Sequence, residues 1–162
     1  MRKPSASAIY RTKKNPASPA GGVVNYYVHE APKESAFRDV ATPYLVKKLE
    51  AGLPVAELDE LQHSLDLPTE KLAPMLGISK ATFHRRKGAG EKLESSVSDR
   101  VVRFARLLGK AIMVFGEDDA RRWLNSPQFG LGGAVPLEFA KTEVGAREVE
   151  NLLGRIEYGV YS

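Results

Sequence analysis

The chain has 162 residues, a net charge of +4, a pI near 9.3 and 43% hydrophobic residues. This length suits one domain of ordinary size, or a small domain with appendages. The absence of cysteine excludes disulfides and thiolate metal sites, and the absence of any run of 18 apolar residues argues against a membrane span.

The remaining residues offer no site for a metal or another cofactor. His29, His63 and His84 are scattered, and none has a carboxylate or second histidine at a ligand-like helical spacing. The N-terminus is basic but lacks the apolar stretch of a signal peptide, so we expect an intracellular protein.

Charge is distributed unevenly along the chain. Residues 1–48 hold 9 basic and 3 acidic residues, residues 49–97 hold 6 and 8, and residues 98–162 hold 9 of each. Positive charge also gathers over residues 79–106, with 8 basic and 3 acidic residues. This distribution favours a polyanionic partner.

Residues 1–33 are rich in Ser, Ala, Pro, Lys and Arg and show no sustained periodicity. This composition predicts a disordered basic arm. Within it, the β-prone run VVNYYV at residues 23–28 has no evident pairing partner; it docks as a strand or remains an apolar patch. Two functions fit the arm: a flexible tail, or a source of non-specific DNA contacts through counterion release.

From residue 34 the pattern becomes helical. Apolar residues recur at spacings of three and four over residues 37–49, with Pro43 marking a kink or a boundary. Gly52 ends that element. A second apolar stripe predicts a helix that begins at Pro54 and ends near Asp66.

Residues 68–87, PTEKLAPMLGISKATFHRRK, predict two short helices joined by a tight turn. We expect Thr69 to cap the first helix and Ser79 the second, because their hydroxyls can accept from free amides in the opening turn. Gly77 occupies a position that often needs a positive φ. Phe83 is expected to face the first helix. This is the pattern of a helix-turn-helix, whose second helix enters the DNA major groove.

The second helix of this motif presents a basic face. Lys80, His84 and Lys87 follow at i, i+4 and i+7, with Arg85 beside them. Such side chains suit phosphates and guanine edges. The predicted DNA-binding residues are Ser79, Lys80, His84, Arg85 and Lys87. A solvated basic face on an ordinary helical hairpin fits the same pattern.

Two residues depart from the usual motif. Pro74 lies in the body of the first helix, where it removes a hydrogen bond and favours a bend. Arg86 lies near the inward face, where an aliphatic residue would pack better. Its long side chain can extend sideways to a phosphate or to an acidic neighbour.

Residues 87–96, KGAGEKLESS, have the composition of a linker. Ser98 is expected to cap a long helix over residues 98–115, whose apolar residues form a wide stripe at 3–4 spacing. Another side of this helix carries Arg100, Arg103 and Arg106. These arginines either line DNA beside the helix-turn-helix or lie in solvent.

The last third of the chain predicts further helices. Residues 117–124 carry acids in the first turn and bases in the last, which complements the helix dipole. Trp123 is expected in the core. Pro136 is expected at a first helical position, and Thr142 is expected to cap a final helix that ends near Glu157.

Three segments together resemble the Xre/ParS-type antitoxins of bacterial toxin–antitoxin pairs. They are LAPMLGISKATFHRRK, SDRVVRFARLLGKA and WLNSPQFGLGGAVPLEFAKTEVGAREVENLLGRIEYGVYS. The resemblance covers roughly residues 53–162. It is most specific at the C-terminus, where LGG-x-x-PLE is followed by TE-x-GAREVE-x-LLGRIE-x-GV. The basic arm lies outside it.

The resemblance implies an all-α protein, a helix-turn-helix bundle with a helical C-terminal toxin-binding region. The expected parts are a basic arm (1–33), a DNA-binding domain (34–116) and a toxin-binding domain (117–162). Such antitoxins are partnered with RES-domain toxins, which consume NAD. The antitoxin's C-terminal segment covers the toxin's active site, and the complex represses its own operon.

The implied partners are therefore a cognate RES-domain toxin and operator DNA in the bacterial cytoplasm. A homodimer within a toxin–antitoxin hetero-oligomer is expected. Matching positions give the toxin-binding residues Glu143, Arg147, Glu150, Arg155, Tyr158, Tyr161 and Ser162. The last two are expected nearest the toxin's catalytic pocket.

Independently of the resemblance, the chain has no nucleophile–base pair at motif spacing and no phosphate-binding glycine motif. It is therefore expected to bind partners and not to be an enzyme. A second hypothesis is a stand-alone helix-turn-helix regulator whose C-terminal helices dimerise, with the stripe over residues 101–115 as the seam. A third is a structural adaptor with no role in DNA binding.

Overall fold

The computed structural model describes residues 22–30 and 42–159. Over these ranges the chain is helical and has no strand, which confirms the predicted all-α class. The helices are α2 (Val23–Asn25), η1 (Tyr26–Glu30), α3 (Thr42–Ala51), α4 (Ala56–Leu65), α5 (Thr69–Leu76), α6 (Lys80–Ala89), α7 (Ser95–Phe115), α8 (Glu117–Leu124), η2 (Phe129–Leu131), α9 (Pro136–Phe139) and α10 (Glu143–Glu157). No helix in the described ranges is both long and apolar enough to cross a membrane.

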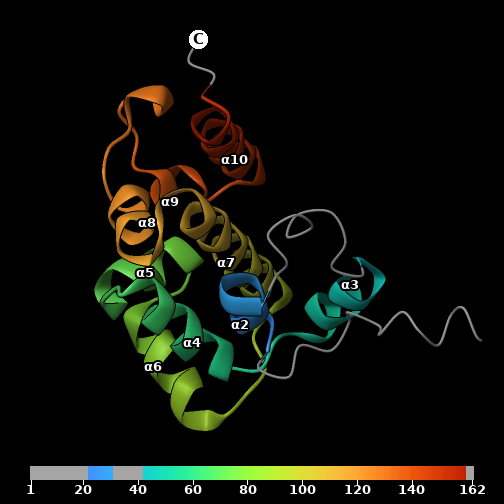
Figure 1. The fold of residues 1–162 in the computed structure, drawn as a ribbon. Coiled ribbons are helices and arrows are strands. Elements are labelled where there is room, and N and C mark those ends of the chain that lie inside the picture. The colour runs from blue at the N-terminus through green and yellow to red at the C-terminus, as the bar shows by residue number, and fades with distance from the viewer. Residues whose placement is uncertain (1–21, 31–41, 160–162) are drawn as a thin grey trace, which may run out of the picture.

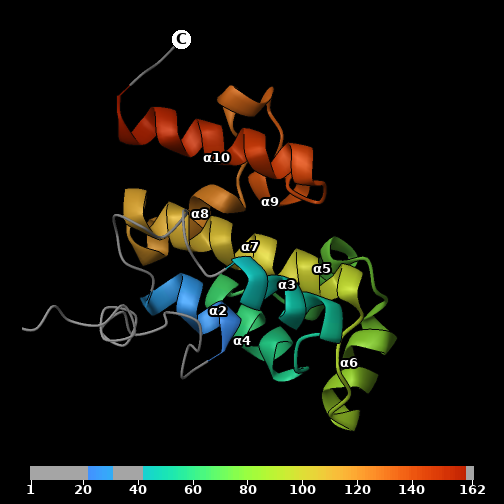
Figure 2. The same ribbon diagram turned by 90° about the vertical axis from the view of Figure 1, so that its right-hand side faces the viewer.

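Helix α7 lies at the centre of the fold. In Figures 1 and 2, α10 and α9 lie on one side of it and α2, α3 and α4 on another. Its predicted apolar stripe is confirmed, because Val101, Phe104 and Leu108 are fully buried. The chain's own helices cover this stripe. Most of the dimer seam of the second hypothesis is therefore covered by the chain's own helices, while Ile112 and Phe115 at its C-terminal end are partly buried.

Over residues 23–30, the structure corrects the prediction of disorder and of a β-prone run; residues 1–21 and 31–33 of the predicted arm lie outside the described residues. The segment over residues 23–30 forms α2 and one π-helical turn, and it buries Val23, Val24 and Tyr27 against the core. The carboxylate of Glu57, at the start of α4, accepts from the amides of Val23 (2.7 Å) and Val24 (3.1 Å). These are opening amides that a helix cannot pair internally. A tertiary contact thus overrides the strand preference of the valines.

The same segment packs closely on α7. Gly109 faces the carbonyl oxygen of Tyr27, and any Cβ at this position would overlap that oxygen. Burial raises the pKa of the Tyr27 hydroxyl, although the nearby Arg106 acts in the opposite direction. The glycine in α7 is therefore required by the close approach of the N-terminal segment.

The predictions for residues 87–98 need correction as well. Helix α6 continues to Ala89, and α7 begins at Ser95, so Ser98 lies inside the helix. Ser98 is fully buried, and its hydroxyl accepts from the amide of Leu53 at 3.0 Å. Leu93 is also buried, and its amide donates to the carbonyl of Leu53 at 2.9 Å. The bond from Leu93 ties the expected linker to the core, and the bond to Ser98 ties the start of α7 to it.

Candidate nucleic-acid interface and C-terminal binding surface

The helix-turn-helix forms from α5 and α6 as the sequence predicts. Gly77 ends α5 at φ 75°, and the Ser79 hydroxyl caps α6 by accepting from the amide of Thr82 at 3.0 Å. Phe83 is fully buried. The expected cap at Thr69 is wrong, because Pro68 precedes the helix and the Thr69 hydroxyl instead accepts from Gln62 Nε2.

Helix α5 continues past Pro74 to Leu76, and Pro74 itself is exposed. The ring therefore lies on the solvent side of the helix. The buried residues Leu72 and Leu76 remain on one face and contribute to the core. Pro74 leaves the framework of the motif intact.

Three of the predicted DNA-binding side chains on α6 are exposed: Lys80, His84 and Arg85. Arg85 makes no hydrogen bond or ion pair with any residue in the described ranges, so its guanidinium is available. Lys80 pairs with Glu70 of α5, and both side chains are more than half exposed. The hydrogen bond from Lys80 holds the pKa of the Glu70 carboxyl below its usual value. Glu70 therefore partly neutralises this face.

Lys87 turns away from that face, toward α4. Its ammonium pairs with Asp59, donates to Gln62 Oε1 at 3.3 Å and lies 5.3 Å from the centroid of the Phe83 ring. Arg86 is nearly buried and pairs with Glu94 at 2.6 Å, so it reaches an acidic neighbour and not open solvent. Both residues stabilise the motif internally.

The arginines of α7 make contacts within the chain that the two alternatives drawn from the sequence do not include. Arg100 donates to the carbonyl of Leu76 at 2.9 Å and lies against Gly77, which ties α7 to the turn of the motif. Arg103 donates to the carbonyl of Lys141 at 2.7 Å, and Arg106 donates to Glu150 at 2.7 Å. The row joins α7 to the helix-turn-helix at one end and to α10 at the other.

Helix α10 begins as predicted, with Thr142 accepting from the amide of Gly145 at 3.1 Å. Arg147 and Tyr158 are largely exposed, with 74% and 78% of their surface accessible. Glu150 is turned toward α7, where it pairs with Arg106.

Glu143 is half exposed and pairs with Arg103, Arg106 and Arg147. The structure thus separates the predicted toxin-binding residues into the exposed Arg147 and Tyr158, the partly buried Arg155, and a pair of carboxylates, on Glu143 and Glu150, that join α10 to α7. Tyr161 and Ser162 lie outside the described residues.

Sequence reasoning passed over two exposed apolar side chains in this region. Phe129 is fully exposed in η2, and Val144 is 74% exposed at the start of α10. The loop of Phe129 is seated on α10 through Gly130, which contacts Leu152. A single aromatic residue in a glycine-rich loop gives no periodic signal, so its exposure could not be read from the pattern.

Comparison with known proteins finds a match for each half of the chain. Residues 45–106 match the antitoxin Xre-like helix-turn-helix domain, and residues 110–159 match the antitoxin Xre/MbcA/ParS C-terminal toxin-binding domain. The chain is 34% identical over 128 residues to "Antitoxin Xre" of Photorhabdus laumondii, covering 78% of this chain and 86% of that protein. It is 30% identical over 145 residues to "Antitoxin Xre" of Yersinia enterocolitica, covering 85% and 98%.

The chain belongs to the Xre/MbcA/ParS antitoxin family. A more distant relative, "Prs ADP-ribosylating antitoxin" of Sphingobium sp., is 23% identical over 124 residues, covering 70% of this chain and 78% of that protein. Membership confirms the predicted family and confirms that this antitoxin is not an enzyme. Its C-terminal toxin-binding domain implies a cognate toxin as partner.

The two halves of this Xre/MbcA/ParS antitoxin share α7. The helix-turn-helix match ends at residue 106 and the toxin-binding match begins at residue 110, both inside that helix. The predicted division at residues 116 and 117 coincides with the end of α7 and stays a prediction. A continuous helix, with Arg100 near one end and Arg106 further along, joins the helix-turn-helix to α10.

Proposed function

We propose that this antitoxin neutralises a cognate RES-domain, NAD-consuming toxin by covering the toxin's active site with its C-terminal segment. The observation that carries the proposal is the toxin-binding match over residues 110–159, which ends on an exposed, charged helix and the exposed Tyr158. The C-terminal sequence motifs, which resemble those of antitoxins partnered with RES-domain toxins, support this class of toxin. The name of the Sphingobium relative refers to ADP-ribosylation, a reaction whose donor is NAD, and is consistent with it.

The toxin-facing residues are proposed to be Arg147, Arg155 and Tyr158, together with Tyr161 and Ser162 of the terminal segment. Glu143 and Glu150 contribute indirectly, because their ion pairs with the arginines of α7 position α10. This division refines the predicted set. Among the described residues, it assigns recognition to the side chains without a partner on α7 and orientation to the paired carboxylates.

Removing residues 158–162 is expected to weaken inhibition of the toxin while leaving DNA binding largely intact. The full chain and the truncated chain would be coexpressed with the RES-domain protein encoded by the neighbouring gene, and cell survival and NAD content would be measured. The truncated chain keeps α10 up to Glu157 and therefore keeps the packing of Val149 and Leu153. Full protection by the truncated chain would refute the role of the tail.

The second part of the proposal is that the antitoxin represses its operon in the bacterial cytoplasm through α6. The exposed cations Lys80 and Arg85, with His84 between them, support this interface. The Ser79 hydroxyl serves as a cap, so we propose that Ser79 acts at this interface by fixing the start of α6. Lys87 is proposed to stabilise the motif through its contacts with α4.

A homodimer within the toxin–antitoxin complex also stays a prediction, to be checked by the molar mass of the complex in light scattering.

Arg85→Ala and Lys80→Ala are each expected to weaken operator binding, by about 1–3 kcal/mol where the side chain contacts a base edge. Binding would be measured against salt concentration, since each lost phosphate contact reduces the magnitude of the negative slope of log K against log salt by about 0.9. Glu70→Gln is the matched control and is expected to strengthen operator binding, because it removes the ion pair that holds Lys80. Arg147→Ala should leave DNA binding unchanged, and equal effects of all these variants would contradict the assignment.

A further inference from the structure

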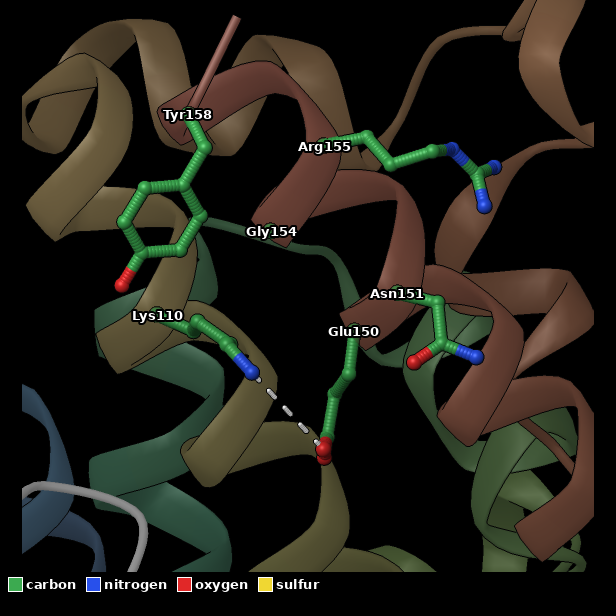
Figure 3. Close-up of a pocket in the computed structure, with 6 residues that line it drawn as sticks. All are labelled: Lys110, Glu150, Asn151, Gly154, Arg155 and Tyr158. Atoms are coloured by element: carbon green, nitrogen blue, oxygen red, sulfur yellow. Dashed lines mark ion pairs between the residues drawn. The ribbon is translucent and has the colours of Figure 1, made fainter. Parts of the chain in front are cut away.

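A pocket of about 480 Å³ opens at the C-terminal end of α10, beside α7. Its lining residues are Lys110, Glu150, Asn151, Gly154, Arg155 and Tyr158. All six fall within the toxin-binding match over residues 110–159. Figure 3 shows Gly154 at the centre, with Tyr158 and Lys110 on one side and Asn151 and Arg155 on the other.

The charge around this pocket is predominantly positive. Glu150 is its one acidic lining residue, and that carboxylate is already bound to Arg106 at 2.7 Å and to Lys110 at 3.9 Å. Arg155 makes no hydrogen bond or ion pair with any residue that the structure describes. The lining therefore retains the cationic charge of Arg155 after its internal ion pairs are counted.

The unused polar groups are mainly donors. The guanidinium of Arg155 presents five N–H groups in a planar fork that matches a carboxylate. The exposed amide of Asn151 has no hydrogen-bond partner among the described residues, and it adds two further donors. Tyr158, which is 78% exposed, supplies an aromatic wall and a hydroxyl. The occupant that suits this lining has a carboxylate and a short aliphatic stem.

We propose that this pocket is the seat of an acidic side chain, Asp or Glu, from the toxin. The inference rests on the proposed function, because it assumes that this face of the antitoxin meets the toxin. Arg155 and Asn151, which lie on the same side of Gly154 in Figure 3, would hold the carboxylate. Charge-assisted pairs of this kind are strong and geometrically selective, and buried Tyr and Arg anchors carry much of the energy of interfaces.

Gly154 offers a test that leaves the fold intact. A Cβ at this position would meet nothing within 4 Å, so a larger side chain fits without disturbing the core. Glycine inside a helix is also unfavourable relative to alanine or leucine, so neither replacement should cause unfolding. Gly154→Leu fills the pocket, and Gly154→Ala is the matched control that leaves most of it open.

The affinity of each full-length variant would be measured by calorimetry with the toxin that copurifies with the wild-type chain, alongside thermal melting of the variant alone. Gly154→Leu is expected to raise Kd by at least about tenfold and Gly154→Ala by less than about threefold. Arg155→Gln is expected to raise Kd by about tenfold, since it removes a charge-assisted pair. The acidic toxin residue is identified by a double-mutant cycle, in which its loss costs little once Arg155 is already replaced.

The possible results separate the two levels of the proposal. If Gly154→Leu is folded and binds the toxin as tightly as the wild type, the pocket is not a seat and the inference is overturned, while toxin neutralisation stands. If no acidic residue of the toxin couples to Arg155, the assignment of the occupant is overturned. If the wild-type chain itself binds no toxin, the proposed function fails and the pocket assignment falls with it.

Discussion

Replacing Arg103 with methionine is expected to lower the free energy of unfolding by about 3 kcal/mol, since hydrogen bonds from a charged donor contribute roughly 1.5–3 kcal/mol each. Arg103 is 8% exposed, and its guanidinium donates to the carbonyls of Lys141 at 2.7 Å and Ala140 at 3.4 Å. These carbonyls follow α9, where a helix leaves acceptors unpaired. Methionine would keep the packing volume but leave both carbonyls without this donor.

The same guanidinium also pairs with Asp99 at 2.6 Å and with Glu143 at 3.3 Å. Both carboxylates are about half exposed, so water can solvate them in the variant and their share of the loss is small. Most of the expected effect therefore comes from the carbonyls. Urea unfolding followed by circular dichroism would measure it.

Arg147→Met is the matched control for this prediction. Arg147 lies on α10, is 74% exposed and pairs only loosely with Glu143, at 3.7 Å. Its replacement is expected to change the free energy of unfolding by less than about 0.5 kcal/mol. Similar losses for the two variants would mean that Arg103 does not tie α7 to the corner between α9 and α10.

Local signals predicted the helix-turn-helix well because each one acts within a few residues. Ser79 and Thr142 cap the following helix through a hydroxyl bonded to an amide three residues on, and Gly77 takes the positive φ that its position suggested. The burial of Phe83 follows from helical spacing alone. In these cases the chain neighbours supply the partner, so the sequence contains the whole interaction.

Residues whose partners lie far along the chain were predicted poorly. Ser98 is a residue type that often caps helices, but its hydroxyl accepts from the amide of Leu53, 45 positions away. Arg103 reaches the carbonyl of Lys141, 38 positions away, and so belongs to neither solvent nor DNA. The helical spacing of Ser98 and Arg103 predicts on which side of α7 each residue lies. Which groups cover that side depends on how α9 and α10 pack, and periodicity within one helix carries no information on that.

The candidate site divides in the same way. Exposure of Lys80, His84 and Arg85 follows from the helical face opposite Phe83. Lys87 was expected on that face, but Asp59 and Gln62 of α4 draw its ammonium inward. On α10, neither its charge nor its position in the helical pattern distinguishes Glu150 from the exposed acidic residues of the same helix. It faces α7 because Arg106 stands opposite it.

Replacing Glu57 with alanine is expected to release the N-terminal segment from the core and to lower the free energy of unfolding by about 2–3 kcal/mol. The Glu57 carboxylate is 7% exposed and accepts from the two opening amides of α2. Without it, these amides would be buried without an acceptor or would undock into water. Hydrogen exchange at Val23 and Val24 should accelerate by at least about tenfold, because exchange reports local opening.

Glu60→Ala is the control within the same helix, since Glu60 makes no ion pair or hydrogen bond with any residue in the described ranges.

Gly109→Ala tests the contact between the N-terminal segment and α7, and the sign of its effect on the free energy of unfolding is informative. Alanine normally stabilises a helix interior relative to glycine by about 0.5–1 kcal/mol. At Gly109 its Cβ would overlap the Tyr27 carbonyl oxygen, so the variant should be destabilised, whereas Gly154→Ala should be stabilised. If both alanine variants are stabilised and Glu57→Ala leaves Val23 protected, the segment is not held against α7 in solution.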